Sequence, residues 1–92
     1  MWWYNYLLKS KKDSSWYIGC TNNLKNREKM HNLGKVKSTR NSKPWELIYY
    51  EACKNKINAF RRERYLKSGY GRRFLKKRLM EYNSERKVIE NY

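Results

Sequence analysis

The stretch of residues 17–31 constrains this chain more than any other part of its sequence. It starts at Tyr17 near the end of a predicted strand, passes Gly19, which predicts a tight turn, and continues into an asparagine-capped helix. Arg27 and His31 are four residues apart, which places a guanidinium and an imidazole on one face of that helix. A strand that leads directly into such a helix predicts a site that holds a phosphate.

Strand, turn and helix signals divide the rest of the chain into the same kind of short elements. The predicted strands cover residues 2–9, 16–20 and 45–53. The first predicted helix is capped by Asn22 or Asn23, runs to about Asn32 and is closed by Gly34. The second is capped by Asn55 and runs to about Lys67, and the third covers residues 72–82. The order β-β-α-β-α-α predicts an α/β (α+β) sandwich, in which a small three-stranded antiparallel sheet is flanked by helices. We expect residues 1–82 to form one domain and residues 83–92 to form a C-terminal tail.

The charge of the chain indicates the class of its partner. Among 92 residues, 23 are Lys or Arg and 8 are Asp or Glu, which gives a formal net charge of +15. A polyanion is the natural complement of such a field, and nucleic acid is the first candidate. We expect no membrane association, because no apolar run approaches the ~18 residues of a span and no basic amphipathic helix of the interfacial type is evident. A basic protein without any chemistry, of the ribosomal type, is the plain alternative.

The two cysteines, Cys20 and Cys53, lie far apart in the sequence and form neither a zinc-binding spacing nor a disulfide framework. Both fall in predicted strands, where a reduced thiol is the expected state. This pattern favours a cytoplasmic protein.

The scarcity of acids and histidines excludes several kinds of nuclease. Asp13 is the one aspartate and the chain has one histidine, whereas two-metal nucleases need several carboxylates and nucleases of the ββα-metal type use more than one histidine. Glu63 is the acid that we select, because Ala59, Glu63 and Leu66 follow helical spacing and place the carboxylate on an apolar stripe. A buried carboxylate needs a metal or a cation, and a salt bridge to an arginine is the alternative.

Four other side chains have chemistry that suits a phosphate site. Arg27 can clamp a phosphate and His31 can shuttle a proton, although each is also compatible with an ordinary surface or satisfied polar residue. Tyr6 and Tyr17 lie on neighbouring strands of a predicted hairpin, so either can reach one site, or either can simply pack in the core. A tyrosine that acts as a base needs positive charge nearby, since its ordinary pKa is about 10.

These residues together make the chain resemble the GIY-YIG nuclease domain, and in particular its small stand-alone bacterial members, which look like the N-terminal nuclease of the excision repair incision enzyme. The second signature is intact, whereas the first is degenerate and keeps only its final tyrosine. The resemblance covers residues 2–79 and rests on five motifs in order: Tyr4-Asn5-Tyr6, Tyr17-Ile18-Gly19 with Arg27 and His31, Lys37-Ser38-Thr39-Arg40 with Pro44, Leu47-Ile48-Tyr49-Tyr50-Glu51, and residues 59–67 with Arg62-Glu63.

The resemblance implies a role for each candidate residue. Glu63 would bind one divalent cation, Mg²⁺ or Mn²⁺, and Tyr17 or Tyr6 would help to activate the attacking water. Arg27 would stabilise the pentavalent phosphate, assisted by His31. The resemblance implies no small-molecule cofactor.

Two functions from different classes follow from these expectations. The first is a metal-dependent endonuclease that hydrolyses DNA phosphodiester bonds, and the second is a non-catalytic basic nucleic-acid-binding module on the same scaffold. Glu63 favours the enzyme, because a pure binder has no use for a carboxylate beside DNA. We expect weak sequence preference, steep salt dependence and a preference for branched, nicked or flapped DNA. The residues predicted to bind the nucleic acid are Lys37, Arg40, Arg62, Arg72, Arg73, Lys76 and Lys77.

Overall fold

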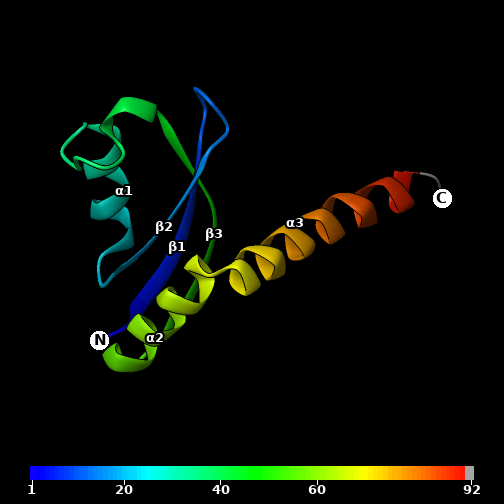
Figure 1. Cartoon of the computed structure of the whole chain (residues 1–92). Helices are drawn as coiled ribbons and strands as arrows, with labels where there is room; N and C mark the ends of the chain where they lie inside the picture. The colour runs from blue at the N-terminus through cyan, green and yellow to red at the C-terminus, as the bar shows by residue number, and fades with distance from the viewer. Residues whose placement is uncertain (91–92) are drawn as a thin grey trace.

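The protein is a three-stranded sheet with one helix on one face and two helices on the other (Figure 1). A computed structural model describes the backbone of residues 1–90 and the side chains of residues 1–79. The predicted order β-β-α-β-α-α and the α+β fold are confirmed. The elements are β1 (Trp3–Ser10), β2 (Trp16–Thr21), α1 (Leu24–Asn32), the 3₁₀ turn η1 (Arg40–Ser42), β3 (Trp45–Cys53), α2 (Lys56–Lys67) and α3 (Gly69–Glu90).

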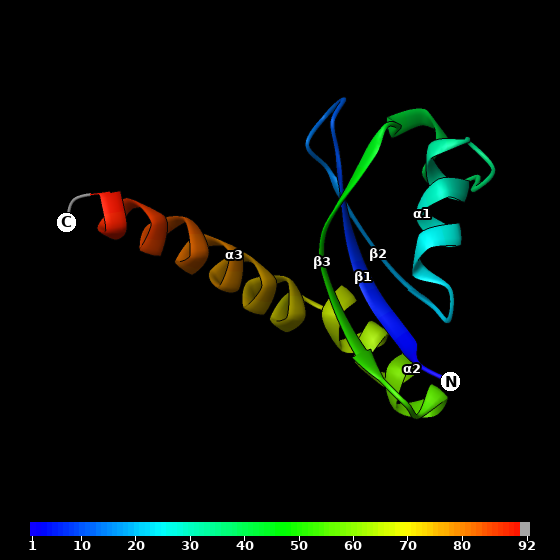
Figure 2. The same cartoon turned by 180° about the vertical axis from the view of Figure 1, so that it is seen from behind.

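The sheet has the order β2-β1-β3, and both strand pairs are antiparallel. The central strand β1 carries two consecutive leucines, Leu7 and Leu8, which are almost fully buried although successive side chains of a strand point to opposite faces. Both faces of the sheet are therefore covered at this point, and Figures 1 and 2 show α1 on one side and α2 with α3 on the other.

Each face of the sheet has its own small core. Leu7 and Ile18 pack with Leu66 and Leu75 from α2 and α3, and this side is called the Leu7 face below. The other core contains Tyr6, Leu8 and Trp45, and this side is called the Tyr6 face. The predicted candidate tyrosines thus fall on the face that α1 partly covers.

Short side-chain caps fix the starts of the first two helices. The Asn23 side chain accepts a hydrogen bond from the Asn26 backbone N–H at 3.1 Å, which settles which asparagine caps α1. Asn55 caps α2 in the same way, from the backbone N–H of Asn58 at 2.9 Å. Gly34 has a φ of 75°, so it takes the left-handed conformation just after α1, as the sequence predicts.

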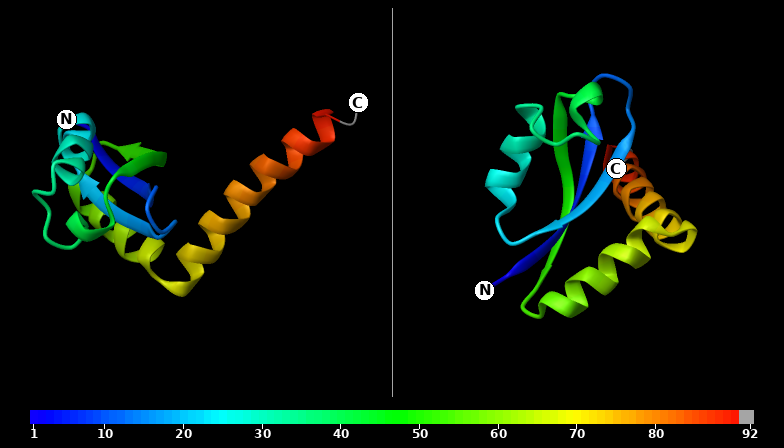
Figure 3. Two further views of the ribbon diagram at one scale, coloured as in Figure 1. Left: turned by 90° about the horizontal axis from the view of Figure 1, so that it is seen from above. Right: turned by 60° about the vertical axis from the view of Figure 1, so that its left-hand side comes forward.

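The third helix differs from its prediction at both ends. It begins at Gly69, directly after Ser68 ends α2, and not at Arg72. The sharp corner depends on Gly71, because a Cβ there would meet the Tyr65 carbonyl and the Leu66 Cα. The helix then continues to Glu90, into the segment 83–92 that was predicted as a tail of uncertain structure, and it projects away from the sheet (Figure 3). The division into a domain and a tail stays a prediction.

No helix in the described part of the chain combines the length and the apolar composition that crossing a membrane requires.

Candidate active site

The glycine of the second signature lies inside a strand and not in a turn, so the predicted tight turn at Gly19 is wrong. Gly19 is buried in β2, directly opposite Tyr6 of β1. A Cβ at this position would overlap the Tyr6 hydroxyl and would lie 2.5 Å from the Cζ atom of its ring. A glycine therefore lets the Tyr6 ring lie across β2. Tyr6 is only 2% exposed as a result.

The Tyr6 hydroxyl is hydrogen-bonded to a buried histidine. Its oxygen lies 2.8 Å from Nε2 of His31, and Nδ1 of His31 lies 2.7 Å from Oγ1 of Thr39. The Thr39 hydroxyl can donate to the Val36 carbonyl at 3.4 Å, which leaves its oxygen free to accept from Nδ1. In that arrangement Nε2 carries no proton and accepts the hydrogen of the Tyr6 hydroxyl. The histidine, expected on a helix face, is thus a fully buried link between two hydroxyl groups.

Burial keeps both members of this pair neutral at physiological pH. It raises the pKa of Tyr6 to about 12, although the nearby Arg27 guanidinium acts in the opposite direction. Burial also lowers the pKa of His31 to about 4, and the positive charge of Arg27 lowers it further. Transfer of the Tyr6 proton to His31 is therefore unfavourable in the free protein.

Tyr17 and Arg27 complete the group on the Tyr6 face. Tyr17 lies opposite Leu8 in the register, which puts it on the same face as Tyr6, and its half-buried ring lies 5.0 Å from the His31 ring and 6.4 Å from the Tyr6 ring. Arg27 lies one turn before His31 on α1, and its charge affects the pKa of both Tyr6 and His31. The structure thus brings these four predicted residues together.

Glu63 lies on α2, which packs on the Leu7 face of the sheet. Its negative charge raises the pKa of Cys20, near the end of β2, and also that of Tyr6 on the other side of that strand. Oε2 of Glu63 lies 3.1 Å from Nζ of Lys67, and the Glu63 side chain is 21% exposed. The salt bridge considered as the alternative role of Glu63 is therefore present, but its partner is a lysine one turn away and not an arginine.

The residues around Glu63 fit a single divalent cation. Among the described residues no group of three His, Cys, Asp or Glu side chains gathers, so the protein has no closed metal cage there. Mg²⁺ keeps several waters and is commonly bound by one or two carboxylates together with substrate phosphates. Among the described residues, the ion-pair partner of the Glu63 carboxylate is the partly exposed Lys67. Because exposed ion pairs of this kind contribute little stability, a cation can replace the lysine beside the carboxylate.

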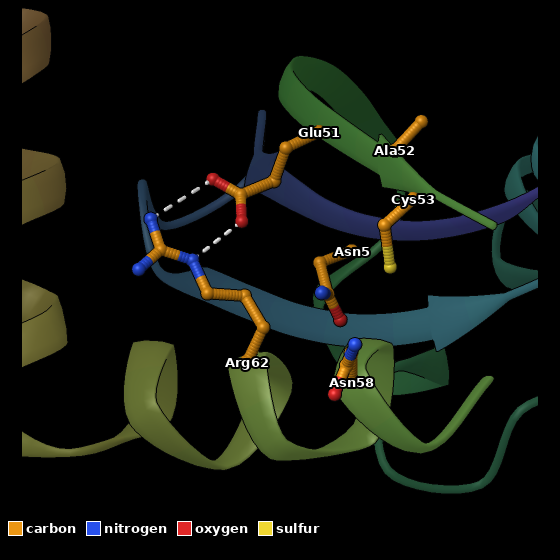
Figure 4. A pocket seen from close by; sticks show the side chains of 6 residues that line it. All are labelled: Asn5, Glu51, Ala52, Cys53, Asn58 and Arg62. Atoms are coloured by element: carbon orange, nitrogen blue, oxygen red, sulfur yellow. Dashed lines mark hydrogen bonds and ion pairs between the residues drawn. The ribbon is translucent and has the colours of Figure 1, made fainter. Parts of the chain in front are cut away.

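Arg62, one of the predicted nucleic-acid contacts, is engaged inside the fold. Its Nε donates to Oε1 of Glu51 at 2.5 Å and its Nη2 donates to Oε2 at 3.2 Å (Figure 4). Its guanidinium also lies 5.1 Å from the ring centres of both Tyr65 and Phe74. This pairing holds the pKa of Glu51 below its usual value. The geometry favours a structural role for Arg62, and its contact with nucleic acid stays a prediction.

A pocket of about 260 Å³ lies beside this ion pair, between β1, β3 and α2 (Figure 4). At its base the Asn5 Nδ2 donates to the Ala59 carbonyl at 3.1 Å, whereas the buried Oδ1 has no hydrogen-bond partner in the described part of the chain. Asn5 points to the Leu7 face, because it is one residue away from Tyr6 on β1. The pocket is therefore separate from the tyrosine site.

The other predicted phosphate contacts divide between two places. Lys37 and Arg40 are exposed on the connection between α1 and β3. The α3 group consists of the exposed α3 residues Arg72, Arg73, Lys76 and Lys77. Helix α3 lies across the sheet from α1 (Figure 3), and Arg72 and Lys76 lie beside the hairpin that joins β1 to β2.

Comparison with known proteins decides the family. Residues 2–83 match the family described as the GIY-YIG catalytic domain. The chain belongs to the GIY-YIG family. Among relatives of this GIY-YIG protein is the UPF0213 protein CPE1444 of Clostridium perfringens, 49% identical over 65 residues, which cover 70% of this chain and 69% of the relative. The UPF0213 protein OB0043 of Oceanobacillus iheyensis is 39% identical over 83 residues, which cover 89% of this chain and 93% of the relative.

A solved structure also resembles this GIY-YIG domain. The solution NMR structure of the UPF0213 protein BH0048 from Bacillus halodurans matches with a TM-score of 0.53 and 36% identity, and the match covers 84% of each chain. The predicted resemblance to small bacterial GIY-YIG proteins is thereby confirmed.

One residue of the site has no clear signal in the sequence. Thr39 holds Nδ1 of His31 through its hydroxyl, and its backbone carbonyl accepts a hydrogen bond from Nε1 of Trp45 at 2.9 Å. In the sequence it belongs to a basic loop motif and is not a candidate site residue. In the sequence Thr39 lies between the cationic residues Lys37 and Arg40, and nothing in this local pattern predicts that its side chain is buried.

Proposed function

We propose that this protein is a metal-dependent endonuclease that hydrolyses phosphodiester bonds in DNA. The observation that supports this function best is that the buried Tyr6 hydroxyl lies among groups from three other segments. It lies 2.8 Å from Nε2 of His31 on α1, and the Tyr17 ring of β2 lies 6.4 Å from the Tyr6 ring. The charges of Arg27 on α1 and Glu63 on α2 act on the same hydroxyl. A scaffold that only binds DNA has no need to gather a phenol, a guanidinium and a carboxylate around one point.

In this mechanism Tyr17, and not Tyr6, contacts the attacking water. The Tyr6 hydroxyl is buried, has a pKa of about 12 and is already hydrogen-bonded to His31, so it is poorly suited to take a proton. Tyr17 is only half-buried and lies against the same histidine. Tyr6 and His31 then act as positioning residues that hold the Tyr17 ring and its surroundings in place.

Arg27 stabilises the negative charge that develops on the phosphate. Its side chain lies on the Tyr6 face near the Tyr6 hydroxyl, where a cation can approach a phosphate oxygen. The water oxygen forms a bond with phosphorus and loses a proton through the Tyr17 hydroxyl to solvent, while the bond to the leaving oxygen breaks and that oxygen takes a proton from solvent. Charge accumulates during this step on the phosphate oxygens that Arg27 can reach. Loss of this one donor should cost about 10²–10³ in rate.

Glu63 would hold the divalent cation, Mg²⁺ or Mn²⁺. When bound, the cation supplies charge neutralisation and polarises the phosphate. The carboxylate would lose its ion pair with Lys67, at little cost to stability because that lysine is half exposed.

The α3 group supplies affinity for the DNA backbone. Its cations lie on one exposed helix, where they can neutralise phosphates but cannot read bases by charge alone. We therefore propose weak sequence preference and action on branched, nicked or flapped DNA. We also place the protein in the cytoplasm, because Cys20 and Cys53 are free thiols.

The test incubates the protein with plasmid DNA and with nicked, flapped and branched oligonucleotides, in Mg²⁺, in Mn²⁺ and in chelator. Wild-type protein is compared with Tyr17→Phe and Arg27→Lys, and with the matched exposed controls Tyr70→Phe and Arg61→Lys. We expect cleavage only with metal, a loss of at least 10²-fold in the two site variants, and no change in the controls. Cleavage in chelator, or full activity in both site variants, would contradict the mechanism.

The binding module is the other outcome of the same test. If the protein binds these DNAs tightly but cuts none of them with either metal, the scaffold is a non-catalytic binder.

A further inference from the structure

The Tyr6 face carries a second set of aromatic side chains, beyond the four-residue group described above. Tyr4 precedes Tyr6 by two positions on β1, so both side chains point to the same face. Tyr50 of β3 is the cross-strand partner of Tyr6, and it therefore shares that face as well. Tyr6 is 2% exposed, whereas Tyr50 beside it is 54% exposed.

Trp2 extends this set beyond the end of β1. It is 48% exposed, and the Lys54 ammonium lies 5.3 Å from the centre of its ring. The rings of Tyr4 and Tyr50 lie edge to face, 6.0 Å apart. Trp2, Tyr4 and Tyr50 are called the aromatic row below.

The first helix leaves the aromatic row open. The side chains of α1 reach the other half of the face, where His31 meets Tyr6 and Asn32 bonds to the Trp45 backbone. Ala52, the cross-strand partner of Tyr4, is also exposed. The exposed rings of Trp2 and Tyr50 are not needed to hold the fold, so their position near the candidate active site indicates a ligand.

The chemistry of the row identifies that ligand. The chain carries a net charge of +15, and Lys54 lies on the row itself. A ligand that satisfies both the charge and the flat apolar rings is a polyanion with exposed flat faces, which describes a single strand of nucleic acid. A duplex offers phosphates but keeps the faces of its bases stacked inside. Antiparallel neighbours such as Tyr6 and Tyr50 have Cα atoms about 5 Å apart. The Tyr6 hydroxyl lies over β2, so a DNA strand whose phosphate is held there reaches the row when it continues across β1 towards β3.

We propose that the aromatic row stacks unpaired bases of a DNA strand whose phosphate lies in the site formed by Tyr6, Tyr17, Arg27 and Glu63. This inference rests on the proposed function for the position of the phosphate. It sharpens the substrate class, since the preferred DNA has a single-stranded segment beside the cleaved bond. Nicked or flapped DNA qualifies only where it exposes such a segment.

The test measures binding in chelator, so that no cleavage occurs. A single-stranded oligonucleotide and a duplex of the same length are titrated by fluorescence anisotropy with wild type, Tyr50→Ala, Tyr50→Phe and Trp2→Ala. Phe60→Ala is the matched control, because Phe60 is 44% exposed on α2 and lies outside the row. A second titration uses a strand with 2-aminopurine, whose fluorescence is quenched when it stacks on an aromatic ring.

We expect Tyr50→Ala and Trp2→Ala each to weaken single-strand binding by about 5-fold to 100-fold and to reduce the quenching. Tyr50→Phe keeps its ring and should bind like wild type, and duplex binding should not change in any variant. Circular dichroism verifies that each variant is folded, and Trp2→Ala provides an independent reading if Tyr50→Ala fails to fold.

Unchanged single-strand affinity and quenching in both alanine variants would overturn the inference, and so would an equal loss for duplex. Self-association of the wild type that Tyr50→Ala abolishes, with no effect on single-strand binding, would assign the row to a second copy of the chain instead. The proposed function is tested separately from this inference. If the protein stacks bases on the row but cleaves no DNA, the inference holds and the nuclease proposal is wrong. If the protein cleaves DNA but Tyr50→Ala does not change single-strand binding, the nuclease proposal holds and the inference is wrong.

Discussion

The hydroxyl oxygen of Tyr6 and Nε2 of His31 lie 2.8 Å apart in the interior of the protein, between the central strand and the first helix. Both groups are neutral at physiological pH because burial raises the pKa of the tyrosine and lowers that of the histidine. The pair therefore holds the site together as an uncharged hydrogen bond. Its consequences can be measured in stability and in activity.

Removal of this hydrogen bond should destabilise the protein. Tyr6→Phe leaves Nε2 of His31 buried without a donor, which should lower the free energy of unfolding by about 1–3 kcal/mol. Urea denaturation measures this change, and Tyr70→Phe, at an exposed position, should have no effect. Equal stability of Tyr6→Phe and wild type would show that the 2.8 Å contact contributes nothing.

The buried histidine should make stability depend on pH in a defined window. In the unfolded chain His31 has a pKa near 6.5, and in the folded protein burial lowers the pKa to about 4. The unfolded state therefore binds the proton first. The contribution of His31 to the free energy of unfolding should be fully present above about pH 6.5. The free energy of unfolding should then fall by about 3 kcal/mol as the pH drops towards 4.

Urea denaturation between pH 5 and pH 7.5 tests this slope. His31→Gln should lack it, because glutamine does not titrate. The carboxyl groups of Asp13 and Glu51 have lowered pKa values, so their own losses of stability begin near the ordinary carboxyl pKa of about 4 and continue at lower pH, below the tested range. A wild-type profile that is flat from pH 7.5 to pH 5 would contradict the account.

Gly19→Ala should disturb the site without touching a polar group. The added Cβ would overlap the Tyr6 hydroxyl and its Cζ atom, so the ring must move. We expect a loss of about 1–3 kcal/mol in stability and a loss of activity. Gly69→Ala is the matched control, since a Cβ there meets nothing within 4 Å. Similar behaviour of the two variants in thermal unfolding would refute the role of Gly19.

The α3 group should control the salt dependence of DNA binding. Replacement of Arg72, Arg73 and Lys76 by Gln should weaken binding to all sequences alike. It should also reduce the slope of log K against log salt by about 0.9 for each phosphate of duplex DNA that the variant no longer neutralises. Affinities measured across a range of salt concentrations give this slope. Replacement of the exposed Lys11 and Lys12 in the β-hairpin turn serves as the control for net charge, and an equal change in slope there would show that the α3 group has no special role.

The sequence predicted the elements well because their signals are local. The aromatic and apolar run of β1, the caps Asn23 and Asn55, and the left-handed Gly34 each depend on a few neighbouring residues. The sequence predicts the start of α3 at Arg72, three residues too late, because Gly69 and Gly71 are typical of a helix break. The structure places the corner before Gly69 and uses Gly71 for a close helix contact.

The site could be predicted as a set of residues but not as a geometry. Tyr6, Tyr17, Arg27 and His31 come together because strand register and helix packing place them, and no local pattern contains that information. The burial of His31 depends on Thr39, eight residues away on an irregular connection. The role of Gly19 depends on a cross-strand neighbour. The pairing of Arg62 with Glu51 likewise joins two elements that only the tertiary fold brings into contact.

The most direct test of the proposed nuclease is the rate of DNA cleavage by Glu63→Gln as the concentration of Mg²⁺ or Mn²⁺ is raised. Glu46→Gln is the matched control, because Glu46 is an exposed glutamate of β3 away from the tyrosines. We predict that Glu63→Gln still binds DNA but cleaves it at least 10²-fold more slowly at every metal concentration, while Glu46→Gln cleaves like wild type. Metal-dependent cleavage by Glu63→Gln at the wild-type rate would contradict the account.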